Sequence, residues 1–220
     1  MDVKQFENNR WQREDQAVQF RHTAALDLIR GVEIVLDLGS GDGLLLSLLK
    51  EKGIAGKGLD LSDEGVAKAN AKGLDTQVFD FGSKTLPFAD ASFDAVVMLD
   101  ILEHLYDPES VLKEAARVSK KSVIVGVPNF SSLPARLQTL MGRVPENNQP
   151  KKGHVYWFNL PALKRAFAAA NLDLIDIRVN TFFESVPFVR HVTKAFSKIL
   201  PNVFSLSFVA LARKKESPSL

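Results

Sequence analysis

The chain has 220 residues and no cysteine, a length that suits one α/β domain. The absence of cysteine excludes a disulfide framework, a thiolate zinc site, an iron–sulfur cluster and a cysteine nucleophile. The net charge of +2 conceals a split, because residues 1–110 carry 11 Lys and Arg against 20 Asp and Glu, whereas residues 111–220 carry 17 against 6. A split of this kind suggests two jobs, one of which handles an anion.

No targeting or membrane-spanning segment is expected. The first 15 residues are polar and mixed in charge, without the apolar core of a signal peptide. The longest apolar stretch, 203–212, is ten residues long, against the ~20 that a spanning helix needs. We therefore expect a soluble, cytoplasmic protein.

Hydrophobic periodicity predicts helices that alternate with strands. In chain order, the pattern predicts a helix at 12–30, a strand at 33–38, a helix at 44–52, a strand at 56–61, a helix at 63–72, strands at 76–79 and 93–99, a helix at 108–119, a strand at 122–127, a helix at 160–170, and strands at 172–179 and 203–213. Alternation with apolar strands predicts a doubly wound, mostly parallel Rossmann-like sheet covered on both faces, and the last two strands suggest an edge hairpin. We expect a helical cap at 1–30, one domain at 31–213 with a lid near 130–158, and a frayed tail at 214–220.

A glycine-rich turn follows the first predicted strand. Residues 37–43 read Asp-Leu-Gly-Ser-Gly-Asp-Gly, in which Gly39, Gly41 and Gly43 allow a tight turn and a close approach of a ligand to the backbone. The dinucleotide fingerprint needs a further glycine where the chain has Leu44, and no Lys-Ser/Thr pair of a phosphate loop follows. Taken alone, the turn could also be a tight strand-to-helix connection that binds nothing.

Acidic residues stand at the ends of the next two strands. Asp60 ends the second strand, where a carboxylate can accept hydrogen bonds from ribose hydroxyls. Asp80 ends the third strand, where it can accept from an adenine amino group with Phe81 beside the ring. Each Asp alone could be a cap or turn residue. Three such features at successive strand ends predict a nucleoside site.

These motifs resemble those of class I S-adenosylmethionine-dependent methyltransferases, of the type 11 and MetW-like kind. The resemblance is carried by residues 35–43, by 58–62, and by Asp80 together with 86–94. It implies S-adenosyl-L-methionine as cofactor and a seven-stranded sheet with an antiparallel last strand. The implied cofactor site comprises Asp37, Gly39, Ser40, Gly41, Gly43, Asp60, Leu61, Asp80, Phe81 and Asp100.

Within the superfamily, the chain is most similar to MetW-like proteins of methionine biosynthesis. The similar stretches are 41–45, 63–66, and 128–130 followed by 136–138. Those proteins have the methyltransferase fold, but their role is associated with homoserine acylation through a partner enzyme. The resemblance therefore leaves two functions open, an enzyme and a cofactor-binding regulatory partner of a methionine-biosynthesis enzyme.

The segment after the fourth strand holds the candidate catalytic residues. If it turns helically, Asp100, Glu103 and His104 lie on one face. Methyl transfer is an in-line displacement that needs alignment, and a base only where the acceptor must lose a proton. His104, whose ordinary pKa is near 6.5, is the predicted base, with Glu103 beside it. The alternative is that both residues are structural.

A metal site is the second alternative for the same segment. Asp100, Glu103 and His104 with His154 would form a ligand set for Mg²⁺ or Mn²⁺. Some RNA 3′-end methyltransferases resemble this arrangement, but Leu-Glu-His is also common in relatives without a metal. We therefore expect no metal, and keep a metal-dependent RNA-end enzyme as an alternative function.

The predicted lid combines basic and aromatic residues. Asn129, His154 and Tyr156 are its candidate substrate-binding residues. No tight basic run exists, so binding to duplex nucleic acid is not expected. The sequence predicts a methyltransferase that acts on oxygen or nitrogen of a small molecule, and the basic second half favours an acceptor with a carboxylate or phosphate.

Overall fold

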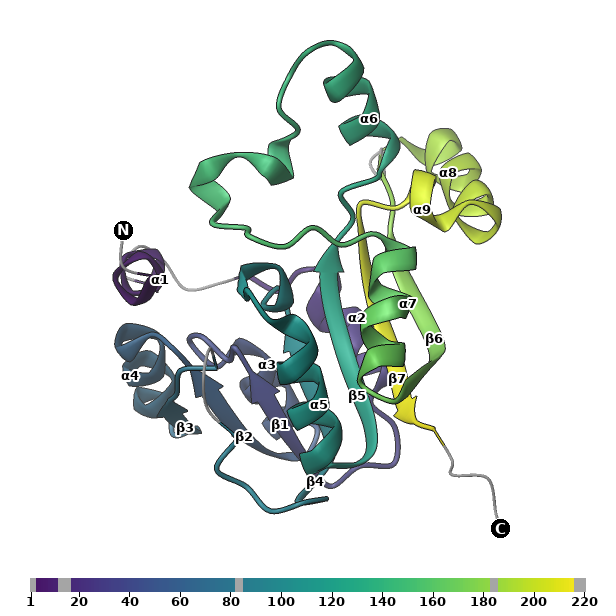
Figure 1. Ribbon diagram of the computed structural model, residues 1–220. Coiled ribbons are helices and arrows are strands. Elements are labelled where there is room, and N and C mark those ends of the chain that lie inside the picture. The colour runs from purple at the N-terminus through teal and green to yellow at the C-terminus, as the bar shows by residue number, and fades with distance from the viewer. Residues whose placement is uncertain (1–2, 12–16, 82–84, 183–185, 216–220) are drawn as a thin grey trace.

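The computed structural model describes residues 3–11, 17–81, 85–182 and 186–215, and among them seven strands form one sheet (Figure 1). The strands are β1 (Ile34–Leu38), β2 (Ala55–Asp60), β3 (Asp75–Val78), β4 (Phe93–Leu99), β5 (Ser119–Pro128), β6 (Leu172–Asn180) and β7 (Ser207–Lys214). Their order is β3-β2-β1-β4-β5-β7-β6. The first five are parallel, whereas β7 pairs antiparallel with both β5 and β6. The predicted fold class is confirmed.

Helices cover both faces of this sheet. The helices of the described ranges are α1 (Val3–Trp11), α2 (Phe20–Leu28), α3 (Leu44–Glu51), α4 (Asp63–Ala71), α5 (Pro108–Val118), α6 (Leu133–Leu140), α7 (Leu160–Ala169), α8 (Pro187–Ile199) and α9 (Pro201–Phe204), of which α6 and α8 lie beyond the strand ends (Figure 1). Side chains of α2 and α3 form one core layer and those of α5 and α7 form the other. Along β4, Val96 and Met98 join one layer while Ala95 and Val97 join the other. This burial on both faces explains the nearly continuous apolar sequence of the strand.

Four of the predicted helices, those at 44–52, 63–72, 108–119 and 160–170, agree with α3, α4, α5 and α7 to within one residue at each end. Ser62 caps α4, because its hydroxyl accepts the Gly65 N–H at 3.1 Å. Gly73, with a φ of +71°, follows the end of the same helix. Pro108 occupies the first turn of α5, and the Asp107 carboxylate caps that helix by accepting the Ser110 N–H at 3.1 Å. Local chemistry thus sets these boundaries.

The last two strands differ from the predicted hairpin. They do pair antiparallel, but β7 lies inside the sheet between β5 and β6, and α8 and α9 separate them in the chain. The strand predicted from residue 203 begins only at Ser207, because Pro201–Phe204 turn as the short helix α9. Of the predicted helix at 12–30, only Phe20–Leu28 is helical: residues 17–19 and 29–30 are described and are not helical, and residues 12–16 lie outside the described part.

Four of the described helices, α1, α6, α8 and α9, were not predicted from the periodicity. The helix α1 is polar around its circumference, so it offers no apolar stripe to detect.

Parallel strands end at one edge of the sheet, and there the ends of β1, β2 and β4 bring the glycine turn, Asp60 and Asp100 together. No helix in the described ranges is long and apolar enough to cross a bilayer.

Candidate functional site

The glycine turn has the geometry that the sequence predicts. Gly39, Gly41 and Gly43 have φ angles of +79°, +52° and +79°, which side-chain-bearing residues rarely adopt. The Leu59 carbonyl on β2 accepts the Gly39 N–H at 2.7 Å, which ties the turn to the neighbouring strand. A Cβ at Gly43 would meet Leu74 at 2.3 Å. Conformation and packing therefore both require glycine here.

Asp60 holds this turn and also faces a cavity. Its Oδ2 accepts the Gly41 N–H at 2.7 Å, and its Oδ1 accepts the Ser62 N–H at 2.8 Å. A carboxylate oxygen can accept a second hydrogen bond, so these contacts leave acceptor capacity for hydroxyl groups of a ligand. Asp60 lines the cavity above the turn, as the sequence analysis expected of a cofactor-binding acid.

Asp37 lies at the floor of the same cavity, on β1. Its side chain is almost fully buried, and burial together with the nearby Asp60 carboxylate raises the pKa of Asp37 to about 8. Asp37 is therefore mostly protonated at neutral pH, when it can donate a hydrogen bond as well as accept one.

The cavity above the turn, which we call the cofactor cavity, has a volume of about 120 Å³. Pockets for ligands of drug size usually have at least ~300 Å³. The space is small because α1 lies over the turn: the Trp11 indole packs on Gly41, where a Cβ would meet it at 2.1 Å. Asn8 holds α1 in place by accepting a hydrogen bond from the Ser62 hydroxyl at 2.6 Å. No sequence pattern predicts this contact, because its only signal is a single tryptophan in a polar segment.

The residues of the cofactor cavity fit S-adenosylmethionine chemically. The glycine turn carries no side chain at the place where the Trp11 indole packs, so a ligand that displaced this indole could approach the Gly41 backbone, and Asp60 offers acceptors for ribose hydroxyls. The Ser40 hydroxyl is buried and has no hydrogen-bond partner among the described residues. A polar ligand group would satisfy this buried oxygen.

A second cavity, of about 940 Å³, continues from the first toward β3. Asp80 lines it and is exposed, whereas Leu61 and Phe81 line both cavities. The structure thus brings the predicted adenine residues Asp80 and Phe81 to the side of the site remote from β5. This arrangement agrees with a nucleoside extending from the turn toward β3.

The third cavity, which we call the acceptor cavity, has a volume of about 850 Å³ and lies beside the cofactor cavity. Asp100 and Arg21 line both of them, and their side chains form an ion pair at 3.1 Å. Asp100 has a φ of +54°, which turns the chain sharply at the end of β4. It stands outside the single 3₁₀ turn η1 (Leu102–His104), so the expected helical face shared by Asp100, Glu103 and His104 is wrong. A left-handed residue ends the strand before the turn begins.

Arg21 is a site residue that the sequence analysis missed. It lies in the first turn of α2, within the segment 1–30 that is expected as a helical cap. Its only sequence signal is a basic residue on the polar side of a predicted helix. Asp42 was missed as well: it lines the cofactor cavity, is buried, and forms an ion pair with Lys72 at 3.0 Å.

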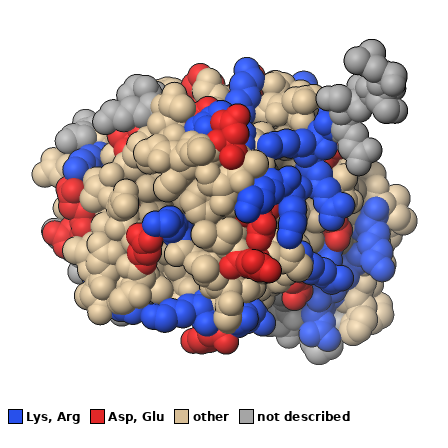
Figure 2. All heavy atoms as spheres, turned by 90° about the horizontal axis from the view of Figure 1, so that it is seen from below, with Lys and Arg blue, Asp and Glu red and all other residues tan. Residues whose placement is uncertain are grey.

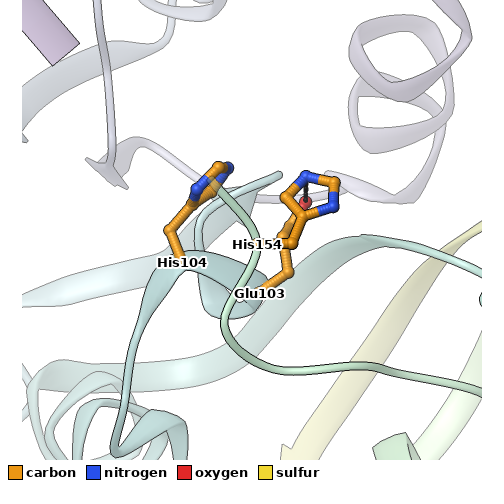
Figure 3. Close-up of side chains that lie close together, drawn as sticks. All are labelled: Glu103, His104 and His154. Carbon is orange, nitrogen blue, oxygen red and sulfur yellow. Dashed lines mark ion pairs between the residues drawn. The ribbon is translucent and has the colours of Figure 1, made fainter. Parts of the chain in front are cut away.

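Glu103, His104 and His154 form a cluster in the wall of the acceptor cavity, with one ligand-type atom of each residue within 4.8 Å of the others (Figure 3). The His154 Nε2 atom lies 4.0 Å from Glu103 Oε1, and the two imidazole rings meet edge to face with centroids 4.9 Å apart. His104 Nδ1 lies 3.1 Å from the Gly153 carbonyl, and His154 Nδ1 lies 2.8 Å from the Asn147 carbonyl. Because a carbonyl only accepts, each Nδ1 carries the proton of a neutral ring, which leaves Nε2 with a lone pair.

His104 occupies the central position in this arrangement. It lines the cofactor cavity, the acceptor cavity and the cavity toward β3. The main chain of the same turn holds the lid segment, because the Glu103 carbonyl accepts the N–H groups of Val155 and Tyr156 at 2.8 and 3.0 Å. A base or a metal ion at this place would face both ligands. The donor set itself suits Mn²⁺, Fe²⁺ or Zn²⁺, which accept imidazole and carboxylate ligands.

The other two candidate lid residues, Asn129 and Tyr156, make contacts that hold the lid segment against the rest of the protein. Asn129 is fully buried, and its amide donates to the carbonyls of Asn202 and Ser205 at 3.0 and 2.7 Å. Tyr156 packs on Phe158 with ring centroids 4.7 Å apart. His154 is the one of the three that lines the acceptor cavity within the described chain.

The chain matches the family model described as methionine biosynthesis protein MetW over residues 19–211. It is 30% identical to a phosphatidylethanolamine N-methyltransferase of Cereibacter sphaeroides over 71% of this chain and 77% of that protein. It is 38% identical to norajmaline N-methyltransferase of Rauvolfia serpentina, but over 39% of this chain and only 32% of that protein.

A solved structure shows the same fold at low sequence identity. Magnesium protoporphyrin IX methyltransferase of Synechocystis PCC 6803, with bound S-adenosylhomocysteine, superposes with a TM-score of 0.67. The two chains are 16% identical, with 97% of this chain and 98% of that chain covered. From the family match, the relatives and the fold together, the chain belongs to the MetW family within the class I S-adenosylmethionine-dependent methyltransferase superfamily.

Proposed function

We propose that the protein is an S-adenosylmethionine-dependent methyltransferase that moves a methyl group to oxygen or nitrogen of a small molecule. The observation that carries this proposal is the position of His104, which lines the cofactor cavity and the acceptor cavity at once. Methyl transfer needs the acceptor atom in line with the cofactor's sulfonium methyl group, and a shared wall between two cavities provides such an alignment.

The roles of the cofactor-binding residues follow from their positions. S-adenosylmethionine supplies an activated methyl group when it is bound. The glycine turn positions its methionine part, Asp60 accepts from the ribose hydroxyls, and Asp80 with Phe81 binds the adenine. Asp37, which burial keeps mostly protonated, supports the turn from below without adding a full negative charge beside Asp60.

His104 acts as the base toward the acceptor in this proposal. With its Nδ1 proton directed at the Gly153 carbonyl, its Nε2 lone pair can take the proton that a hydroxyl group loses as it attacks, or the proton that an ammonium group must lose before its nitrogen can attack. Glu103 and His154 hold the imidazole in its wall. The in-line displacement then transfers the methyl group without any covalent intermediate on the chain.

The acceptor in this proposal is a small molecule. The similarity to two proteins named N-methyltransferases supports a nitrogen atom as the methyl acceptor, beside the oxygen expected from the sequence. The acceptor cavity contains Lys151 and Lys152, which favours a carboxylate or phosphate on the acceptor. Glu146 partly balances this charge through an ion pair with Lys151 at 3.2 Å. Labelled S-adenosylmethionine added to a metabolite extract would identify the compound that gains the methyl group.

The cofactor assignment is tested by calorimetry on Asp60 variants. Asp60→Ala should abolish S-adenosylmethionine binding, because it removes the ribose acceptor and the anchor of the Gly41 N–H. Asp60→Asn keeps the shape and one acceptor oxygen, so it should weaken binding while the chain stays folded. Unchanged affinity in both variants would contradict the assignment.

The match to the MetW family model also supports a second function, a cofactor-binding regulatory partner of a methionine-biosynthesis enzyme. In that role the site would bind S-adenosylmethionine or its product and report its level. Isolation of a stable enzyme partner, together with no methyl transfer to any metabolite pool, would favour this function. Methylation of a defined acceptor by the purified chain would count against it.

The Glu103, His104 and His154 cluster supports a metal-dependent variant of the first function, including the RNA-end enzyme considered from the sequence. A divalent ion held there would make the acceptor hydroxyl more acidic and so replace the base. This variant predicts that a chelator and His154→Ala each abolish methyl transfer, and that added Mn²⁺ restores the chelated wild type. Full activity in chelator would leave His104 as the base.

A further inference from the structure

We propose that the helix α8 docks on an anionic lipid surface. The docking face, which we call the α8 surface, consists of an exposed apolar stripe flanked by a basic one. The apolar stripe is Phe188, Val192, Phe196 and Ile199, and the basic stripe is Arg190, Lys194 and Lys198. This proposal concerns a part of the chain that the proposed methyl transfer does not use.

The helix α8 is oriented with its apolar side outward. Phe188 and Ile199 are 78% and 75% exposed, whereas Thr193 and Ser197 are each 4% exposed. An amphipathic helix of a monomeric globular protein normally faces its core with the apolar stripe. Here the small polar stripe packs inward, so the apolar stripe requires another surface to cover it.

The inward polar side chains are satisfied within the helix itself. The Thr193 hydroxyl donates to the Val189 carbonyl at 3.0 Å, and the Ser197 hydroxyl donates to the Lys194 carbonyl at 2.9 Å. Such back-bonding lets Ser and Thr be buried without outside partners. The orientation of α8 therefore leaves no buried hydroxyl of its inner face unsatisfied.

The charge of the segment points to an anionic surface. Residues 186–206, which include α8 and α9, contain three cations, Arg190, Lys194 and Lys198, and no Asp or Glu. A basic face beside a stripe of Phe, Val and Ile is the pattern of helices that lie in the interface of an anionic membrane. A second copy of the chain fits less well, because a symmetric interface would bring the two basic stripes together.

A second element presents exposed apolar side chains at the same end of the molecule. The helix α6 and the turn after it lie, like α8, beyond the carboxyl ends of the parallel strands (Figure 1). Leu140, Met141 and Val144 there are 83%, 62% and 61% exposed. Residues 130–145 again contain arginine but no acidic residue. Two elements with the same pattern at one end suit a planar lipid surface.

The test is vesicle flotation of the full chain with phosphatidylcholine vesicles that contain or lack phosphatidylglycerol. Binding should require the anionic lipid and weaken as salt concentration rises, because screening reduces the attraction. Lys194→Glu with Lys198→Glu should lower the partition coefficient at least ~tenfold, from about 1 kcal/mol per lost cation. Lys164→Glu with Arg165→Glu on α7 is the matched charge control and should bind as the wild type does.

The apolar stripe has its own matched pair of variants. Ile199→Ser should lower binding to anionic vesicles ~tenfold or more, because it removes an apolar side chain that enters the interface. Ile175→Ser changes the same residue type at a 51% exposed position on β6 and should have no effect. Circular dichroism of each variant checks that the fold is retained.

Three results would overturn the proposal. Equal binding to both kinds of vesicle, or binding to neither, would show that the chain does not recognise an anionic lipid surface. Equal losses of vesicle binding in the α8 variants and in their controls would show that the α8 surface is not the lipid-binding site. A dimer in sedimentation that Ile199→Ser converts to a monomer would show that a second copy covers the stripe instead.

Discussion

At the scale of single residues, the cofactor cavity is built from groups whose properties depend on burial. Burial and the nearby Asp60 carboxylate raise the pKa of the Asp37 carboxyl to about 8. The pKa of the His22 imidazole is lowered to about 4. Burial is again the largest cause for His22, with the Arg21 cation adding to it. The lowered pKa agrees with the hydrogen bond in which His22 Nδ1 accepts the Gln19 N–H at 3.0 Å.

The pH dependence of stability follows from these two groups. Folded Asp37 keeps its proton up to about pH 8, whereas an unfolded Asp loses it near pH 4, so Asp37 makes stability fall as pH rises through this window. His22 has the opposite effect between about pH 4 and 6.5, because only the unfolded chain binds its proton there. The two effects offset each other below pH 6.5, and Asp37 acts alone above it.

The wild type should lose stability as the pH rises from 6.5 to 8, because unfolding lets Asp37 ionise. We expect that Asp37→Asn, which cannot ionise, does not show this loss. In the wild type without cofactor, this loss should be about 1 to 2 kcal/mol of unfolding free energy. Urea unfolding at several pH values in this range measures it. Parallel profiles for variant and wild type would show that Asp37 is ionised in the folded chain.

Glycine substitution separates conformational strain from packing in the turn. Gly43→Ala should cost about 2 to 4 kcal/mol of unfolding free energy, because it combines a positive φ with a Cβ that meets Leu74 at 2.3 Å. The matched control is Gly53→Ala, which has a φ of +74° but no atom within 4 Å, and it should cost about 1 kcal/mol. Equal costs in urea unfolding would show that Leu74 yields.

At the scale of elements, α1 is the part that most changes the site. Its Trp11 covers the glycine turn, and Lys4 and Asn8 attach it to the start of α4 through Asp63 and Ser62. Neither contact follows from a local pattern, because the two partners are more than 50 residues apart in the chain. The element was missed for this reason, whereas capped helices such as α4 and α5 were predicted closely.

Binding of S-adenosylmethionine should displace the Trp11 indole from the turn, since the remaining cofactor cavity of about 120 Å³ is below the usual ligand volume. Trp157→Phe leaves Trp11 as the only tryptophan of the chain. The emission of this variant should shift to the red when saturating cofactor moves the buried indole toward water. An unchanged emission spectrum, with cofactor binding shown by calorimetry, would mean that the indole stays on Gly41.

At the scale of the whole molecule, the charge split is distributed over several surfaces. The acceptor cavity contains Arg21, Lys151 and Lys152 together with three acidic residues, so it is not strongly basic. Figure 2, seen from below, shows Lys and Arg gathered over one side of the opposite end. A separate cavity of about 290 Å³ there is lined by Arg30, Lys121, Arg178 and Arg213. Most basic residues of the second half thus lie away from the acceptor, which the sequence analysis did not foresee.

If labelling identifies an anionic acceptor, its binding should depend on the lysines of the acceptor cavity and not on basic residues elsewhere. Lys151→Gln with Lys152→Gln should raise its KM ~fivefold or more with little change in kcat, because these cations act on binding. Arg213→Gln with Lys214→Gln, at the opposite end of the molecule, should leave KM unchanged. Similar changes in both variants would indicate a general field effect, and no change in either would favour an uncharged acceptor.

The sequence by itself determined the fold class, the glycine turn and the acids at the strand ends. These depend on local chemistry: apolar period, caps, and the backbone freedom of glycine, each readable within a few residues. It could not determine which distant groups meet. The convergence of Glu103 and His104 with His154, the cover of Trp11 on Gly41, and the outward face of α8 depend on how the elements pack in space. Only the tertiary structure decided them, because contacts between distant residues leave no periodic signal in a single sequence.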